Sequence, residues 1–230
     1  MKSVVFDSRE EWLNWRLGKL TGSSVKDFVG TGRGDVKPGI YRAAAESLIG
    51  SAAIAEGELT SSRVMERGHE LEPKAIERFE RETGKKVSKD LVAWEHENDP
   101  RLAVSPDGVI GKTAAIEVKC LLSTKHIEAL HTRAIPRNTG GYEEQVIQYF
   151  FVNEKLTTLY YAFYHPDFPS GLDFFYLTFT RKELADKIAL QADAEYEAVA
   201  KVRQIVNSLS LYSPSDVVAV NAVKEELLAD

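Results

Sequence analysis

The chain of 230 residues contains only one cysteine, Cys120, so an internal disulfide is excluded. Its apolar runs all fall short of the roughly 18 residues that cross a bilayer, so no membrane-spanning segment is expected. The first residues, MKSVVFDSREEW, lack the apolar core of a signal peptide. These absences favour a protein of the reducing cytoplasm with no membrane partner.

The sequence also has no excess of basic residues, no charged tail, no low-complexity run and no internal repeat. Its 29 lysines and arginines stand against 35 acidic residues, which gives a formal net charge of −6. A protein that coats nucleic acid needs lysine and arginine at its phosphate contacts, so this charge argues against that class. A metal-dependent nuclease is not excluded, because bound ions neutralise its clustered carboxylates.

The length allows one large domain or two small ones, and we expect residues 1–230 to form a single domain. Short β-type runs predict strands at 85–93, 102–104, 109–110, 114–119, 159–164 and 174–179. Helical patterns surround them at 25–29, 40–48, 62–83, 123–130, 142–152, 181–208 and 213–228. Strands surrounded by helices indicate an α/β (α+β) fold.

The stretch SPDGVIGKTAAIEVK, residues 105–119, is the most informative part of the sequence. Side chains alternate along a strand, so Glu117 and Lys119 share one face. The runs at 102–104, 109–110 and 114–119 are expected to form a meander, and a hairpin with Gly108 and Gly111 in its turn can bring Asp107 beside Glu117. Two adjacent carboxylates repel each other unless a cation lies between them, and a hard divalent ion fits. Lys119 would then hold an attacking water or a phosphoryl oxygen, as a phosphodiester hydrolysis site requires.

A purely structural interpretation of this stretch stays open on the residues alone. Pro-Asp-Gly is an ordinary turn tripeptide, and Glu-x-Lys is an ordinary pattern on a half-buried strand. Each is more often structural than functional when taken separately. Their order and spacing favour the functional interpretation, which needs further structural context.

The helix predicted at 62–83 places a carboxylate close to its apolar stripe. The stripe can be traced through Met65, Gly68 or His69, Glu72, Ile76 and Phe79. A core-facing Glu72 would be costly unless it were paired or bound a metal. A rotation by one residue would instead put Leu71 inside and Glu72 at the margin. His69 is expected at the boundary and not as a ligand.

Two further groups of polar residues are candidates for contacts with phosphate. Ser23 lies near the start of a short helix with Arg16 close by, and a helix N-terminus with these groups suits a phosphate. Simple N-capping by serine is the commoner alternative. Gln145 and Gln148 share a face of the helix at 142–152, where they could hold water or phosphate oxygens or only be solvated. The glycine-rich stretch 30–39 is expected to be a surface loop that can touch DNA.

Five segments in one order, EEWLNWRLGKLTGSS, ERGHELE, SPDG, EVKC and YEEQV, resemble the lambda-type phage exonucleases. These are YqaJ-like viral recombinases within the PD-(D/E)xK nucleases, and the match runs from Trp12 to about Tyr164. The resemblance implies a restriction-endonuclease-like core with a central mixed β-sheet flanked by helices. It also implies Mg²⁺-dependent 5′-to-3′ digestion of one strand of linear duplex DNA from 5′-phosphorylated ends. Mononucleotides would be released, and a 3′ single-stranded tail would remain for phage-type recombination.

The resemblance implies roles for residues at matching positions. Lys119 matches the catalytic lysine, and Gln145 matches the glutamine on the following helix. The residues implied as metal ligands are Asp107, Glu117, the backbone carbonyl of Val118, and Glu72. Arg16 and Ser23 match the pair that binds the 5′-phosphate. One departure is Leu121, where the family often has proline, and it bears on the local turn.

The resemblance further implies one or two Mg²⁺ ions, with Mn²⁺ as a substitute. The partners that it implies are double-stranded DNA ends, two further copies of the chain in a homotrimer, and a single-strand annealing protein. The place of action would be the cytoplasm of a bacterial or phage-infected cell. Two alternatives stay open: a restriction-type endonuclease on the same fold, which would cut closed circles, and a non-cleaving DNA-binding or assembly protein.

Overall fold

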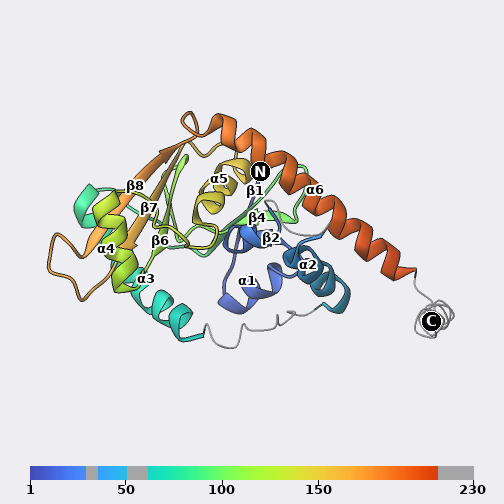
Figure 1. The fold of residues 1–230 in the computed structure, drawn as a ribbon, viewed down its shortest axis with the longest axis horizontal. Helices are drawn as coiled ribbons and strands as arrows, with labels where there is room; N and C mark the ends of the chain where they lie inside the picture. The colour runs from blue at the N-terminus through green and yellow to red at the C-terminus, as the bar shows by residue number, and fades with distance from the viewer. Residues whose placement is uncertain (30–35, 51–61, 212–230) are drawn as a thin grey trace, which may run out of the picture.

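The computed structural model describes residues 1–29, 36–50 and 62–211 (Figure 1). Eight strands lie in these ranges: β1 (Lys2–Val5), β2 (Leu20–Thr21), β3 (Val92–Glu95), β4 (Leu102–Val104), β5 (Gly108–Ile110), β6 (Ala114–Lys119), β7 (Thr158–Tyr164) and β8 (Phe174–Thr180). The helices described are α1 (Arg9–Trp15), α2 (Pro38–Ile49), α3 (Ser62–Thr83), α4 (Ser123–Thr132), α5 (Tyr142–Val152), α6 (Ala185–Ser210) and the 3₁₀ helix η1 (Gly22–Asp27). The predicted helix at 213–228 and most of the predicted glycine-rich loop lie outside the described residues.

The predicted mixed α/β class is confirmed, and the strands are divided between two four-stranded sheets. The first has the order β1-β3-β4-β2 and the second the order β5-β6-β7-β8. Each sheet contains one parallel pair, β2 with β4 and β6 with β7. The predicted meander through 102–119 is therefore wrong, because β4 and β5 belong to different sheets. Pro106 explains the break, since proline donates no hydrogen bond to a continuing ladder.

The strand predicted at 85–93 is also wrong for most of its length. β3 begins only at Val92, and the preceding segment contributes a single bridge, between Ser88 and Val109. Residues 85–90 are charged or polar apart from Val87, and most of them are exposed. They offer no apolar face to a sheet, so pairing begins where the apolar run begins.

The two faces of β6 meet different neighbours, as strand periodicity requires. Ile116 and Val118 pack in one apolar cluster with Ala75 and Phe79 of α3. Glu117 and Lys119 consequently project to the opposite side. There α5 packs between the sheets, in contact with both β4 and β7 (Figure 1). This arrangement presents the charged residues of β6 to a helix that carries polar side chains.

The burial pattern of α3 decides between the two rotations of this helix that the sequence allowed. Leu71, Ala75, Ile76 and Phe79 are buried, whereas Glu72 is only half-buried. Leu71 thus takes the inside position, and Glu72 lies at the margin of the stripe. The helix continues through Pro73 without a break.

Helix α6 begins at Ala185, four residues later than the predicted start at 181. Arg181 lies in the preceding turn, and its guanidinium donates to the carbonyl oxygens of Phe150, Asn153 (2.7 Å) and Leu156 (2.9 Å). These bonds cap the C-terminal end of α5, whose last carbonyls have no partner within the helix. From there α6, orange to red in Figure 1, runs along α5 and α2. None of the described helices combines the length and apolar character that a bilayer crossing requires.

Candidate active site

A pocket of about 700 Å³ lies where α1, η1, α3, α5 and the end of β6 meet. Every residue predicted as catalytic, metal-binding or 5′-phosphate-binding lines it: Arg16, Ser23, Glu72, Asp107, Glu117, Val118, Lys119 and Gln145. These residues come from six separate segments of the chain. The fold therefore places the predicted phosphate-binding and hydrolytic residues in one cavity.

The link between the two sheets places Asp107 beside β6. Gly108 pairs with Ile116, and the Val118 N–H donates to Asp107 Oδ2 at 2.6 Å. Gly108 is required here, because a Cβ atom at this position would lie 2.2 Å from Val87 Cγ1. The hairpin geometry predicted for these carboxylates is thus present, even though β4 is not part of it.

Glu117 is almost fully buried, with 4% of its surface exposed, and is surrounded by donors. Lys119 Nζ and Gln145 Nε2 donate to its Oε1 at 2.6 and 2.8 Å, and the Tyr149 hydroxyl hydrogen bonds to its Oε2. Gln145 is held in turn, since its Oε1 accepts a hydrogen bond from Tyr161 at 3.2 Å. A buried carboxylate with a full set of donors is fixed in one orientation.

The two glutamines of α5 are both buried, so the solvation alternative is wrong for them. Gln145 reaches the pocket, but Gln148 does not. The Gln148 amide donates instead to the carbonyl oxygen of Leu20 at 3.0 Å. The expectation that Gln148 holds water or phosphate in the site is therefore wrong.

The Lys119 ammonium lies over the rings of Tyr142 and Tyr161, at 4.9 and 5.8 Å from their centroids. Burial alone would lower its pKa, but the charges of Glu117, Tyr142 and Asp107 outweigh burial and raise it. Lys119 therefore stays protonated at neutral pH. It can donate hydrogen bonds and stabilise negative charge, and it is unsuited to act as a general base.

Negative charge accumulates on the acidic side of the pocket. Burial, followed by the charges of Glu117 and Glu72, raises the pKa of Asp107 well above its usual value. Burial and Glu117 raise the pKa of Glu72 to about 7, against the effect of Arg9 and Lys119. Each carboxyl group thus disfavours ionisation of the others, and a bound cation would relieve this repulsion.

The donor set fits a hard divalent cation held mainly by two carboxylates. Mg²⁺ commonly binds one or two carboxylates and keeps several waters. Asp107 and Glu117 are adjacent across the hairpin, and the Val118 carbonyl belongs to the same strand end. Among residues 1–29, 36–50 and 62–211, no three acidic, histidine or cysteine side chains form a ready-made metal cluster. Glu72 Oε2 lies 3.8 Å from His69 Nδ1.

A basic wall of the same pocket is organised around Trp12. Arg16 lies over the indole at 4.4 Å, and its Nη2 donates to Ser23 Oγ at 2.8 Å and Thr21 Oγ1 at 3.2 Å. The indole N–H donates to Ser105 Oγ at 3.0 Å, which fixes the ring. Burial lowers the pKa of Arg16, followed by the charges of Arg42 and Arg9. An arginine remains charged under such shifts, so this wall can bind a phosphate.

The N-capping alternative for Ser23 is wrong. The 3₁₀ helix begins at Gly22, so Ser23 lies inside it, and the capping position belongs to Thr21, which makes no side-chain cap bond. The Ser23 hydroxyl instead accepts a hydrogen bond from Arg16. The pair that the sequence suggested is therefore in direct contact.

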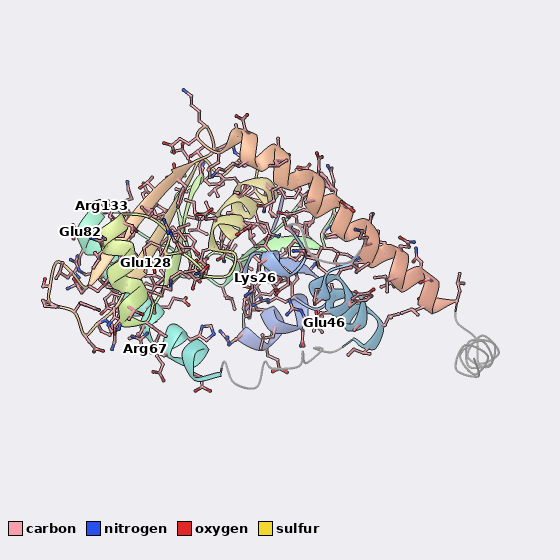
Figure 2. The ribbon with its side chains drawn as sticks, in the orientation of Figure 1. Lys26, Glu46, Arg67, Glu82, Glu128 and Arg133 are labelled. Atoms are coloured by element: carbon pink, nitrogen blue, oxygen red, sulfur yellow. The ribbon has the colours of Figure 1, made fainter. Side chains whose placement is uncertain are left out.

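Arg67 of α3, labelled in Figure 2, supports the segment that follows β6. Its Nη1 donates to the carbonyl oxygen of Cys120 at 3.1 Å. Burial, with the charges of Asp107 and Glu72, raises the pKa of the Cys120 thiol to about 12. The thiol is therefore protonated at neutral pH and is not a nucleophile.

A family model for the YqaJ-like viral recombinase domain matches residues 11–156 of the chain. The chain belongs to this family. The matched range includes every residue assigned to the pocket above, from Arg16 to Gln145. Comparison with curated proteins gave no match.

Solved structures show the same fold as this family member. An alkaline exonuclease, LHK-Exo from Laribacter hongkongensis, is 27% identical with a TM-score of 0.71, covering 87% of this chain and 98% of its own. The same protein in complex with dAMP matches at 26% identity and a TM-score of 0.70, with the same coverage. A phage related exonuclease from Haemophilus somnus 129PT, 17% identical with a TM-score of 0.61, covers 83% of this chain and 96% of its own and shows the fold alone. Family and fold together support a DNA nuclease role.

Sequence reasoning missed several residues of the site in this family member. Tyr149 was not predicted, although it lies four residues after Gln145 and so shares a helical face with it. That spacing was a usable signal. Trp12 and Ser105 were not assigned to the site, and Arg9 was not singled out at all. Their contacts join positions up to 93 residues apart, so no local pattern indicates them.

Proposed function

We propose that the chain is a metal-dependent 5′-to-3′ exonuclease acting on linear double-stranded DNA with 5′-phosphorylated ends. It would digest one strand to mononucleotides and leave a 3′ single-stranded tail for recombination. The observation that carries this proposal is that the Arg16 and Ser23 wall and the Asp107, Glu117 and Lys119 group share one pocket. The dAMP complex of LHK-Exo adds support, because dAMP is a mononucleotide.

The proposed ligands of one or two Mg²⁺ ions, with Mn²⁺ as a substitute, are Asp107, Glu117, the Val118 carbonyl and Glu72. A bound ion would supply Lewis-acid chemistry and a more acidic water. Lys119, protonated, would hold the attacking water or an oxygen of the scissile phosphate and stabilise the charge that develops there. Gln145 and Tyr149 would keep Glu117 in one orientation.

Arg16 and Ser23 would bind the terminal 5′-phosphate and so set the register of the strand. With the end held on the basic wall, the adjacent phosphodiester would be within the same pocket as the carboxylates. Fixing both groups in one cavity lowers the entropic part of the barrier. We further propose that residues 1–230 act as one nuclease domain, in a cytoplasmic homotrimer with a single-strand annealing protein as partner.

Digestion of an asymmetric substrate tests this function. Purified protein is incubated with linear duplex DNA that has a 5′-phosphate at one end only, with Mg²⁺ or with chelator, beside a closed circle. We expect nucleotides from the phosphorylated end alone, only with metal, and an intact circle. A cut circle would assign the site to a restriction-type endonuclease, and absence of any cleavage would favour a DNA-binding or assembly protein.

Substitution of Arg16 tests the phosphate wall separately. Loss of a charged hydrogen-bond donor costs about 1.5–3 kcal/mol, so Arg16→Ala should slow digestion of phosphorylated ends by about 10-fold to 100-fold. Digestion of 5′-hydroxyl ends should change little. Arg81→Ala, an exposed position on α3, is the matched control. Equal losses on both kinds of end would contradict the role of Arg16.

A further inference from the structure

Arg9, in the first turn of α1, is a second arginine on the basic wall of the pocket. Its guanidinium lies over the Trp12 ring at 5.3 Å and hydrogen bonds to His69 Nε2 at 2.8 Å. Among residues 1–29, 36–50 and 62–211, no carboxylate forms an ion pair with it. Within this part of the chain, the Arg9 guanidinium is therefore not neutralised by a direct carboxylate contact.

His69 of α3, which hydrogen bonds to Arg9, does not supply negative charge. A guanidinium only donates hydrogen bonds, so His69 Nε2 must be the acceptor and the imidazole is neutral. Its proton then lies on Nδ1, which faces Glu72 at 3.8 Å. His69 therefore orients Arg9 and leaves its charge free to attract an anion.

The guanidinium groups of Arg9 and Arg16 both lie over the ring of Trp12. The indole is fixed through Ser105, whose hydroxyl donates to the Val92 carbonyl oxygen at 2.6 Å. The positive charge of Arg9 acts on groups of both kinds in the pocket, because it lowers the pKa of Arg16 and also that of Glu72. Arg9 thus lies within electrostatic reach of both the proposed end-binding wall and the carboxylates.

We propose that Arg9 binds an internucleotide phosphate of the strand whose 5′ end is held by Arg16. The inference rests on the proposed function for the direction of the strand. A guanidinium offers donors in a planar fork that matches phosphate oxygens, and an aromatic face preorganises it. Arg9 would therefore act on any end, whereas Arg16 would act on the terminal phosphate.

The rival explanation is that Arg9 only ties α1 to α3 through His69. The two explanations differ in the salt dependence of binding. Each phosphate contact contributes a slope of about 0.9 to the plot of log affinity against log salt, because it releases counterions. A structural tie contributes nothing to that slope. Removal of His69 would break the tie and leave the charge of Arg9 in place.

The test is binding of a fluorescent duplex in chelator over a range of KCl concentrations. Arg9→Ala should weaken binding by about 10-fold on phosphorylated and hydroxyl ends alike and lower the slope by about 1. Arg9→Lys should keep the slope, and so should His69→Ala and the control Arg81→Ala. An unchanged slope in Arg9→Ala, or an equal loss in His69→Ala, would overturn the proposal. Thermal melting of each variant identifies any that fail to fold. If Arg9→Ala is one of them, the salt slopes of Arg9→Lys and Arg9→Gln are compared instead.

Neutral methylphosphonate linkages locate the contact. A single such linkage is placed first, second or third from the end. At one position the wild type should lose affinity while Arg9→Ala loses none. If the linkage weakens binding by the wild type and by Arg9→Ala equally at all three positions, the assignment is overturned. These assays measure binding without cleavage. They can therefore contradict the role of Arg9 while the exonuclease activity is present, and they can support that role when no cleavage is found.

Discussion

Two buried carboxyl groups near α5 have different hydrogen-bond partners. Glu117 of β6 borders the pocket and receives hydrogen bonds from an ammonium, an amide and a hydroxyl. Glu195 of α6 is fully buried, and Gln191 donates to its Oε1 at 2.7 Å. Its Oε2 has no partner within the described part of the chain. Burial raises the pKa of Glu195 to about 8, although the amides of Gln191 and Gln148 oppose this.

The difference shows that depth of burial does not determine the charge of a carboxyl group. Both side chains are almost inaccessible, but one of the three donors to Glu117 is a cation, whereas the groups that hydrogen bond to Glu195 are neutral amides. Glu195 therefore carries a proton at pH 7 and has a structural role. The same helix contacts both groups, Glu117 through Gln145 and Glu195 through Gln148.

The largest effect that would test this contrast is expected at Lys119. Lys119→Ala removes the cation beside Glu117 and the donor proposed to stabilise developing charge. The rate should fall by about 10²-fold to 10³-fold. The melting temperature should also fall, because the buried Glu117 carboxylate loses its counter-ion, so the rate is compared per folded molecule. A Lys125→Ala variant serves as control, and full activity of Lys119→Ala would contradict the assignment of the hydrolytic site.

The next effect concerns the pH dependence of stability at Glu195. Its pKa is about 8 in the folded chain and near 4.5 when unfolded, so the folded state holds the extra proton between these values. Its contribution is complete below about pH 4.5 and is lost as the pH rises through 8, with a slope of up to about 1.4 kcal/mol per pH unit. Glu195→Gln should remove this contribution.

Urea denaturation at pH 5, 6, 7 and 8 measures the free energy of unfolding of both proteins. Asp107 and Glu72 also have raised pKa values, but they are the same in both chains, so the difference isolates Glu195. The Gln variant should gain stability relative to the wild type as the pH rises. Parallel curves would show that Glu195 is ionised in the folded state.

The smallest of the three effects compares two glutamines on one helix. Gln148→Ala leaves the Leu20 carbonyl without its donor and should cost about 1–3 kcal/mol of stability, with the rate per folded molecule unchanged. Gln145→Ala should lower both stability and rate, because Glu117 loses an orienting donor. Rates measured well below the melting temperature, beside urea denaturation, separate the two. Equal rate losses would remove the functional distinction between Gln145 and Gln148.

The sequence predicts the parts of the site that depend on local geometry. Alternation along a strand is fixed, so Glu117 and Lys119 on one face and Val118 on the other followed from spacing alone. Tertiary packing brings Arg16, Glu72 and Gln145 to these residues, and only the family resemblance indicated it. The division of the strands between two sheets had no sequence signal that we recognised, although Pro106 marks the break. Glu195 had none either, because an acidic residue in a long helix normally faces water.

The passage of the chain between the sheets also orders the assembly of the site during synthesis. All four strands of the first sheet precede Ser105, and all four of the second follow Asp107, so the chain crosses between them once. A nascent chain emerges N-terminus first, at roughly 5–20 residues per second. Arg16 is therefore available before the carboxylates, and Gln145 and Tyr149 are made last. No complete hydrolytic centre exists on the ribosome until α5 has emerged.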